Sequence, residues 1–282
     1  MSGLLLKSIA AGTMLLDHIG LLFGIEGLRV IGRAAFPLFA FLFVEGWYRT
    51  HDRGKYFLRM AFWAVLSQIS FSLMKADAGL SFHAYDFRFW AAAAFGIVCC
   101  WLGLEEKKPK LSWLIILPAA VLPGFSFEFL WQGRYVCLFS HSTNVLYTFV
   151  VSMILLYIIE TFSESAMTRR IFLVCAGVAL TAAYGAMCDY SLFGPFLVLL
   201  LYYGRKKKDV TGMALAAAVW GICVYGIPGQ PFFMISVLFA ASLIWLYDAA
   251  KGSGPRWSRR LFYAFYPVHM LVLWAVATLL QI

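Results

Sequence analysis

Two neighbouring ionisable residues, Asp17 and His18, lie inside an apolar stretch near the beginning of the chain. Ionisable groups are costly in hydrocarbon, so residues of this kind are candidates for a functional site. Histidine titrates near neutral pH and is the most frequent general base in enzymes. Adjacent residues of a helix point about 100° apart, so Asp17 cannot simply hold the ring of His18. We therefore expect His18 to be a candidate catalytic base and Asp17 to meet a basic group on another helix.

Arg33 is the basic group that we expect Asp17 to meet, because it begins the next apolar stretch at a comparable depth. A guanidinium at this position could stabilise the oxyanion that develops in a transfer reaction. The alternative is a structural ion pair between Asp17 and Arg33 that fixes helix packing, with His18 hydrogen-bonded nearby. Pro37 follows in the same stretch and predicts a kink, and broken helices at membrane depth usually line cavities.

Other polar residues in or beside apolar stretches are candidates for substrate binding. Glu45 lies four residues before Arg49, so a simple ion pair at a helix end is the alternative there. His269 follows Pro267 in the last apolar stretch, where a structural histidine is the alternative. The remaining candidates lie where two apolar stretches begin, and could instead satisfy backbone groups of the loops there. They are His141, Asn144, Asp189 and Tyr190.

The composition excludes most classes of soluble protein. The chain has 282 residues, of which 62% are hydrophobic, 18% aromatic and only 13% charged, whereas soluble domains carry ~45–50% apolar and ~25% charged residues. The mean hydropathy is +0.80. These values exclude a soluble enzyme, a disordered chain and a coiled coil. They predict an all-α, polytopic integral membrane protein that forms a single helical domain over residues 1–282.

About eleven apolar segments (ten or eleven) predict membrane-spanning helices, although several are shorter than the ~20 residues of a straight crossing. The segment 125–141 is ambiguous, because it is aromatic but also polar, and it could be a re-entrant or interfacial piece. The predicted spans are residues 4–24, 31–48, 56–74, 87–103, 112–126, 142–160, 171–187, 190–203, 212–227, 232–248 and 261–280.

The basic residues predict the orientation of these spans. Most of the 23 Lys and Arg residues lie in alternate loops, which is typical of cytoplasmic loops. The N-terminus is therefore predicted to be cytoplasmic and the C-terminus external. The net charge of +9 arises from these loops, so we do not expect nucleic-acid binding. The six cysteines form no CxxC pair, no metal site is readable, and no GxSxG, HExxH, P-loop or GxGxxG sequence is present.

Five blocks of sequence resemble the TraX family of polytopic bacterial membrane proteins, and together they span almost the whole chain. There are two departures from the family pattern. The segment 68–72 reads Gln-Ile-Ser-Phe-Ser where the family usually has acidic residues, and residues 75–138 resemble an insertion with two extra spans. The five blocks are Met14–Gly20, Leu28–Gly46, Ser140–Thr148, Asp189–Gly194 and Phe262–His269.

The resemblance implies a membrane acyltransferase, because the family's founding activity is acetylation of the N-terminus of conjugative pilin with acetyl-CoA as donor. It implies a multi-pass protein of the bacterial plasma membrane and an acceptor outside the cytoplasm, which could be a glycan, a lipid, a peptide or a small molecule. His18 would deprotonate a hydroxyl or amine of the acceptor, with Asp17 and Arg33 beside it. The basic inner loops suit the phosphates of coenzyme A. The residues expected to attract this donor are Arg205, Lys206, Lys207, Lys208, Arg256, Arg259 and Arg260.

Two other classes of function remain open at the level of the sequence. A transporter or proton-coupled permease could use Asp17, His18 and Arg33 as a polar relay. Such a permease predicts two related halves with broken helices, and no internal repeat is visible in the sequence. A non-catalytic membrane scaffold predicts that His18 can be replaced without loss of function.

Overall fold

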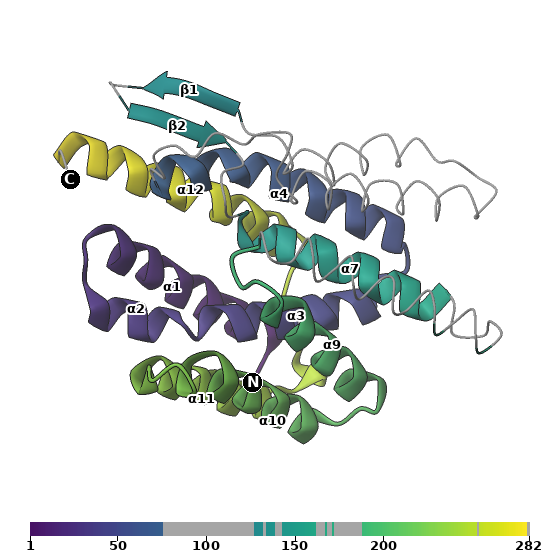
Figure 1. Cartoon of the computed structure of the whole chain (residues 1–282). Coiled ribbons are helices and arrows are strands. Elements are labelled where there is room, and N and C mark those ends of the chain that lie inside the picture. The colour runs from purple at the N-terminus through teal and green to yellow at the C-terminus, as the bar shows by residue number, and fades with distance from the viewer. Residues whose placement is uncertain are drawn as a thin grey trace. The chain divides into compact units, whose positions relative to one another are not determined.

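The computed structural model describes residues 1–75, 127–131, 134–138, 143–161, 167, 171, 188–252 and 254–280 (Figure 1). They form two compact units. The first unit combines Met1–His51 with Phe196–Ile282, and the second is Asp52–Pro195. The single domain over 1–282 and the insertion over 75–138 stay predictions, and most of the insertion lies outside the described residues.

The first unit begins with a helical hairpin. Helix α1 (Gly3–Leu22) is capped by Ser2, whose side chain accepts a hydrogen bond from the backbone of Leu5. The chain reverses through Gly24, which has a φ of +68° that favours glycine, and continues as α2 (Glu26–Gly32). The two helices pack side by side (Figure 1), which brings the end of α2 back to the level of Asp17.

The helical segment Glu26–Arg49 is interrupted directly after α2, at Arg33 and Ala34, which lie before Pro37. Helix α3 (Ala35–Arg49) begins two residues after Arg33, and Pro37 lies in its first turn. A proline has no N–H and its ring clashes with the carbonyl four residues earlier, which here belongs to Arg33. In the first turn of a helix the missing N–H costs little, because it would have no partner within the helix. A break of the helix associated with Pro37 is therefore present, and it lies four residues before the proline, at Arg33.

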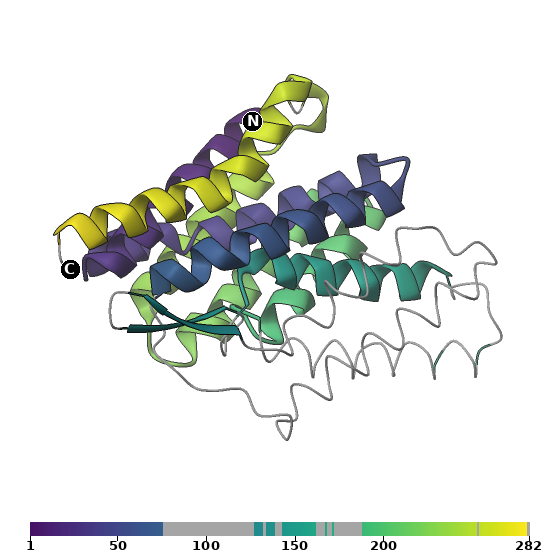
Figure 2. The same ribbon diagram turned by 90° about the horizontal axis from the view of Figure 1, so that it is seen from above.

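The C-terminal part of the first unit is also helical. Asp209 caps α10 by accepting a hydrogen bond from the backbone of Gly212 at 2.7 Å. Helices α10 and α11 pack against each other, α11 also contacts α2 and α3, and α12 runs alongside α1 (Figure 2). The elements are α9 (Phe193–Lys206, whose first three residues belong to the second unit), α10 (Val210–Gly221), the π-helical turn η2 (Ile222–Gly226), α11 (Pro231–Trp245), the 3-10 turn η3 (Ala249–Lys251) and α12 (Arg256–Leu280).

The second unit is built on α4 (Arg53–Lys75) and α7 (Val145–Thr161), which pack against each other. Strands β1 (Phe127–Trp131) and β2 (Arg134–Leu138) form an antiparallel hairpin in which Phe129 pairs with Val136, and β2 contacts α4. The ambiguous segment 125–141 thus contains a β-hairpin where it is described. An antiparallel pair of strands satisfies about half of their backbone groups without a helix.

Four of the described helices are long and apolar enough to cross a membrane: Gly3–Leu22, Glu26–Arg49 (α2 and α3 together), Arg53–Met74 and Arg260–Leu280. Val145–Glu160, Val210–Gly226 and Pro231–Trp245 are shorter apolar helices. Large apolar side chains such as Phe232, Leu215 and Leu279 are exposed on them, as lipid-facing residues are. The protein is therefore a predominantly helical membrane protein. The count of about eleven spans and the cytoplasmic N-terminus stay predictions, and the spans predicted at 87–103, 112–126 and 171–187 fall almost wholly outside the described residues.

Candidate active site

The predicted ion pair between Asp17 and Arg33 is present. Nη2 of Arg33 lies 3.2 Å from Oδ1 of Asp17, and both side chains are 15% exposed. Gly32 makes this approach possible, because a Cβ at that position would overlap the backbone and the Cβ of Asp17. The Arg33 guanidinium also lies over the ring of Phe233, 5.4 Å from its centroid. The carboxylate and the ring together orient the guanidinium where α2 ends.

His18 is hydrogen-bonded to His269 on α12, with 2.6 Å between Nδ1 of His18 and Nε2 of His269. The two ring planes differ by only 7°, and their centroids are 4.9 Å apart. This separation exceeds the N···N distance by about two ring radii, so the rings lie edge to edge in nearly one plane. The hydrogen bond therefore points along the lone-pair direction of the accepting nitrogen, which is its strongest geometry.

The direction of this hydrogen bond follows from a third group. Nδ1 of His269 lies 2.7 Å from the carbonyl oxygen of Phe265, and a carbonyl oxygen can only accept. Nδ1 of His269 therefore carries the proton, and Nε2 of the neutral ring is an acceptor. Nδ1 of His18 must then be the donor to it, and the lone pair of neutral His18 lies on Nε2.

Aromatic side chains hold the histidine pair in a largely apolar setting. The ring of Phe265 stacks on His269 with centroids 4.6 Å apart, and Tyr266 meets His269 edge-on at 5.8 Å. The ring centroid of Tyr266 also lies 6.4 Å from that of His18, and both Tyr266 and His269 are buried. Polar contacts surrounded by apolar rings are stronger than the same contacts in water.

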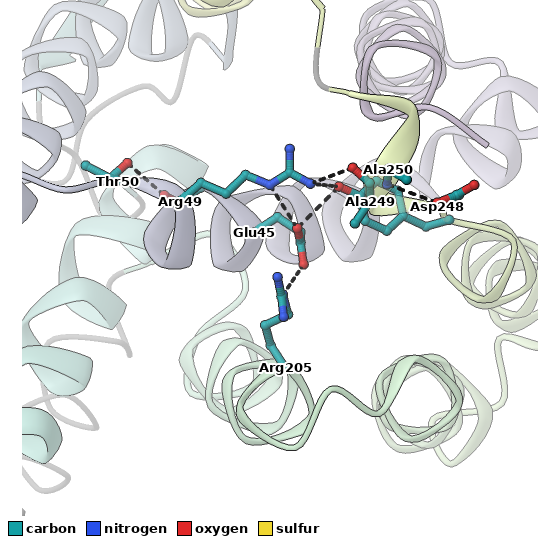
Figure 3. A network of polar contacts seen from close by, with 9 residues as sticks. Glu45, Arg49, Thr50, Arg205, Asp248, Ala249 and Ala250 are labelled. Carbon is teal, nitrogen blue, oxygen red and sulfur yellow. Dashed lines mark hydrogen bonds and ion pairs between the residues drawn. The ribbon is translucent and has the colours of Figure 1, made fainter.

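A second polar cluster in the first unit, shown in Figure 3, surrounds Glu45, which is 5% exposed. Arg49 Nε lies 3.3 Å from its carboxylate, and Arg205 forms an ion pair with the other oxygen. Tyr247 donates a hydrogen bond to Oε2 of Glu45 at 3.2 Å and accepts one from Arg49 at 2.7 Å. Burial, and then the Glu45 carboxylate, raises the pKa of Tyr247 to about 12, so the phenol is protonated at neutral pH.

This cluster changes how two sets of predicted residues are interpreted. The expected pair of Glu45 with Arg49 is present but is one part of a larger network, and Glu45 has the contacts of a structural residue. Arg205 is committed to that network and packs over the ring of Tyr48 at 5.4 Å. The other basic residues predicted to attract the donor are exposed where their side chains are described, namely Lys206, Lys207, Lys208 and Arg260. The side chains of Arg256 and Arg259 are not among those that the structure describes.

The candidates from the second unit have structural contacts of their own. Asn144 caps α7 by accepting from the backbone of Leu146 at 3.0 Å, and its amide donates to Ala64 O at 2.8 Å and to Gln68 Oε1 at 2.9 Å. These bonds account for the burial of Asn144, so its role in substrate binding stays a prediction. Asp189 and Tyr190 lie in the turn before α9, where Asp189 is exposed, and His141 lies outside the described residues.

The family model described as TraX protein matches residues 2–143 and 135–277 of the chain, which together cover nearly all of it. The chain belongs to the TraX family. A similar protein is the probable fimbrial assembly protein FimC, serogroup H1, of Dichelobacter nodosus, which is 25% identical over 292 residues covering 98% of this chain and 96% of the relative. No solved structure matches the chain. In this TraX family member, residues of the matched segments supply the Asp17–Arg33 ion pair and the His18–His269 pair.

Sequence reasoning missed three contributors to these sites. The Phe265 carbonyl and the Tyr247 hydroxyl are not distinctive in sequence, since one belongs to the backbone and the other to a common residue at a helix end. Gly32 carried a signal, because a glycine directly before Arg33 in an apolar stretch indicates a close approach of two backbones.

Proposed function

We propose that this TraX family member is a membrane-embedded acyltransferase. It transfers an acyl group, with acetyl as the expected case, from a cytosolic acyl-CoA to a hydroxyl or amine at the outer half of the membrane. One observation carries the proposal: His18, with its lone pair on Nε2 when both rings of the pair are neutral, follows directly in α1 on Asp17, the residue that forms an ion pair with Arg33. The transfer of an acyl group requires a proton acceptor and a cation that stabilises the oxyanion, and this part of the first unit supplies a residue of each kind.

In the proposed reaction, His18 acts first as general base and then as general acid. Nε2 of His18 takes the proton from the acceptor O–H or N–H as that atom attacks the thioester carbonyl carbon. The carbon–sulfur bond then breaks, and the proton on His18 passes to the departing thiolate, so the products are an ester or amide and the coenzyme A thiol. A general base of this kind contributes typically ~10²–10⁴-fold to the rate.

In this proposal, Arg33 stabilises the negative charge that develops on the carbonyl oxygen. A guanidinium has five N–H donors, so its ion pair with Asp17 is compatible with a further acceptor. Asp17 keeps the guanidinium in place and balances its charge in the apolar surroundings. This division of roles makes Asp17 a positioning residue for Arg33.

The donor reaches the site from the basic side of the protein in this proposal. The exposed Lys206, Lys207 and Lys208 attract the phosphates of coenzyme A, whereas Arg205 serves the Glu45 network. This arrangement follows the predicted topology of about eleven spans with a cytoplasmic N-terminus in a bacterial plasma membrane. The name of the FimC relative favours a subunit of a surface fibre as the acceptor.

The test uses the full chain in lipid nanodiscs with acetyl-CoA labelled in the acetyl group. Release of coenzyme A is measured by chromatography, and label is followed into the protein, lipid and small-molecule fractions of a membrane extract. We expect His18→Ala to lose ~10²-fold or more of this turnover, while His51→Ala, at an exposed histidine of the same unit, retains it. Unchanged turnover in His18→Ala would overturn the proposal, as would solute transport without consumption of acetyl-CoA.

A further inference from the structure

We propose that His269 is a positioning residue for His18, and not a substrate-binding residue as the sequence suggests. It holds His18 in the tautomer whose proton is on Nδ1, which presents Nε2 as the proton-accepting atom. This inference rests on the proposed function for its catalytic consequence, but the tautomer itself is a property of the resting protein.

With both rings neutral, the chain of hydrogen bonds has only one direction. It begins at the Phe265 carbonyl, passes through both nitrogens of His269 and ends at Nδ1 of His18. Because Phe265 lies one helical turn before His269, the acceptor is fixed by the backbone of α12 itself. Rotation of the His269 ring would lose both hydrogen bonds and the stacking on Phe265.

The same contact favours the charged form of His18 during the reaction. When Nε2 takes a proton, His18 becomes an imidazolium whose Nδ1–H still donates to the neutral ring of His269. A hydrogen bond from a charged donor is roughly twice as strong as one between neutral groups. His269 therefore does for His18 what a carboxylate does for the histidine of a hydrolytic triad, since it selects the tautomer and stabilises the imidazolium.

Two substitutions at position 269 separate this role from simple packing. The side-chain oxygen of Gln reaches the place of Nε2, so His269→Gln keeps an acceptor for His18. The amide of Asn reaches only the place of Nδ1, so His269→Asn keeps the bond to Phe265 and loses the one to His18. We expect His269→Gln to retain turnover within about threefold and His269→Asn to lose about 10–100-fold, as for other groups that orient a functional histidine.

A spectroscopic measurement tests the tautomer without any assay of activity. The chain has only five histidines, so ¹⁵N labelling of histidine gives few imidazole signals, and the position-18 and position-269 variants assign them. We expect His18 in the wild type to carry its proton on Nδ1 at neutral pH. His269→Gln should keep that state, and His269→Asn should give a mixture of tautomers.

The outcomes distinguish the inference from the proposed function. A proton on Nε2 of His18 in the wild type would overturn the inference, and so would equal losses in the Gln and Asn variants, which indicate packing or proton transfer through His269. If the tautomer is as expected but His18→Ala keeps full turnover, the proposed function fails while the assignment of His269 stands. The wild-type spectrum needs no variant, so a variant that fails to insert does not weaken the test.

Discussion

Gly32 lies directly against Asp17, so closely that a Cβ on Gly32 would overlap the Asp17 backbone. This contact sets the distance between α1 and α2, and therefore the geometry of the ion pair that Asp17 forms with the next residue, Arg33. The backbones approach closely because one of them has no side chain at the point of contact.

We expect Gly32→Ala to lower the free energy of unfolding by ~1–3 kcal/mol, the usual cost of forcing extra atoms into a packed interface. Thermal unfolding in detergent measures the effect, and turnover should fall with it because Arg33 moves away from Asp17. Gly27→Ala on the same helix is the matched control, since nothing lies within 4 Å of the place of its Cβ. Equal behaviour of the two variants would show that α1 and α2 are not in close contact at Gly32.

Removal of one charge of the Asp17–Arg33 pair should destabilise the protein more than removal of both. Asp17→Asn leaves the largely buried Arg33 without its counter-ion, and breaking a buried pair in this way costs about 3–5 kcal/mol. The double variant Asp17→Asn, Arg33→Gln should recover part of that loss, and a double-mutant cycle on unfolding free energies measures the coupling. Additive losses would contradict an energetic link between the two side chains.

The Glu45 network should behave as a structural element. Glu45→Gln leaves Arg49 and Arg205, which are partly exposed, beside a neutral amide, and we expect a loss of about 1.5–3 kcal/mol, the usual worth of a hydrogen bond to a charged group. Tyr247→Phe removes one hydrogen bond and should cost only ~1 kcal/mol. Both effects are read from unfolding curves, and a milder effect of Glu45→Gln than of Tyr247→Phe would refute this ranking.

The raised pKa of Tyr247 predicts that the free energy of unfolding falls at high pH. A carboxyl group whose pKa is lowered by an ion pair would make it fall at low pH instead. The folded protein binds the phenol proton more tightly than the unfolded chain, whose phenol titrates near 10. The stabilisation is therefore complete below pH 10 and is lost as the pH rises toward about 12. The difference in stability between the wild type and Tyr247→Phe should shrink over that interval, and a constant difference would contradict the cause.

Replacement of Lys206, Lys207 and Lys208 by Gln should raise the apparent KM for acetyl-CoA, and should do so more at low than at high salt. The unfolding temperature should not change, because these side chains are exposed. Replacement of the same three residues by Arg keeps the charge and should keep the KM. Indifference of the KM to the Gln variant at low salt would place the entry of the donor elsewhere, with Arg260 as the next exposed basic residue to test.

Much of the helical framework and one of the two contacts at the candidate site could be predicted from the sequence. Apolar runs and basic loops act over short stretches of chain, so the helices at 3–22, 53–75 and 256–280 follow from local composition. The pairing of Asp17 with Arg33 was also predictable, because a charge in an apolar helix needs a counter-ion and the next helix offers one.

Only the tertiary structure decided which distant groups meet. His269 is 251 residues from His18, and neither an apolar pattern nor the cost of a buried charge indicates which helix of a bundle packs beside α1 or in what register. The same holds for Glu45, whose partner Arg205 comes from α9 and whose partner Tyr247 lies two residues after the end of α11. Local composition determines that a segment enters the membrane as a helix, whereas side-chain pairing depends on non-local packing, and that packing brought His269 within hydrogen-bond distance of Nδ1 of His18.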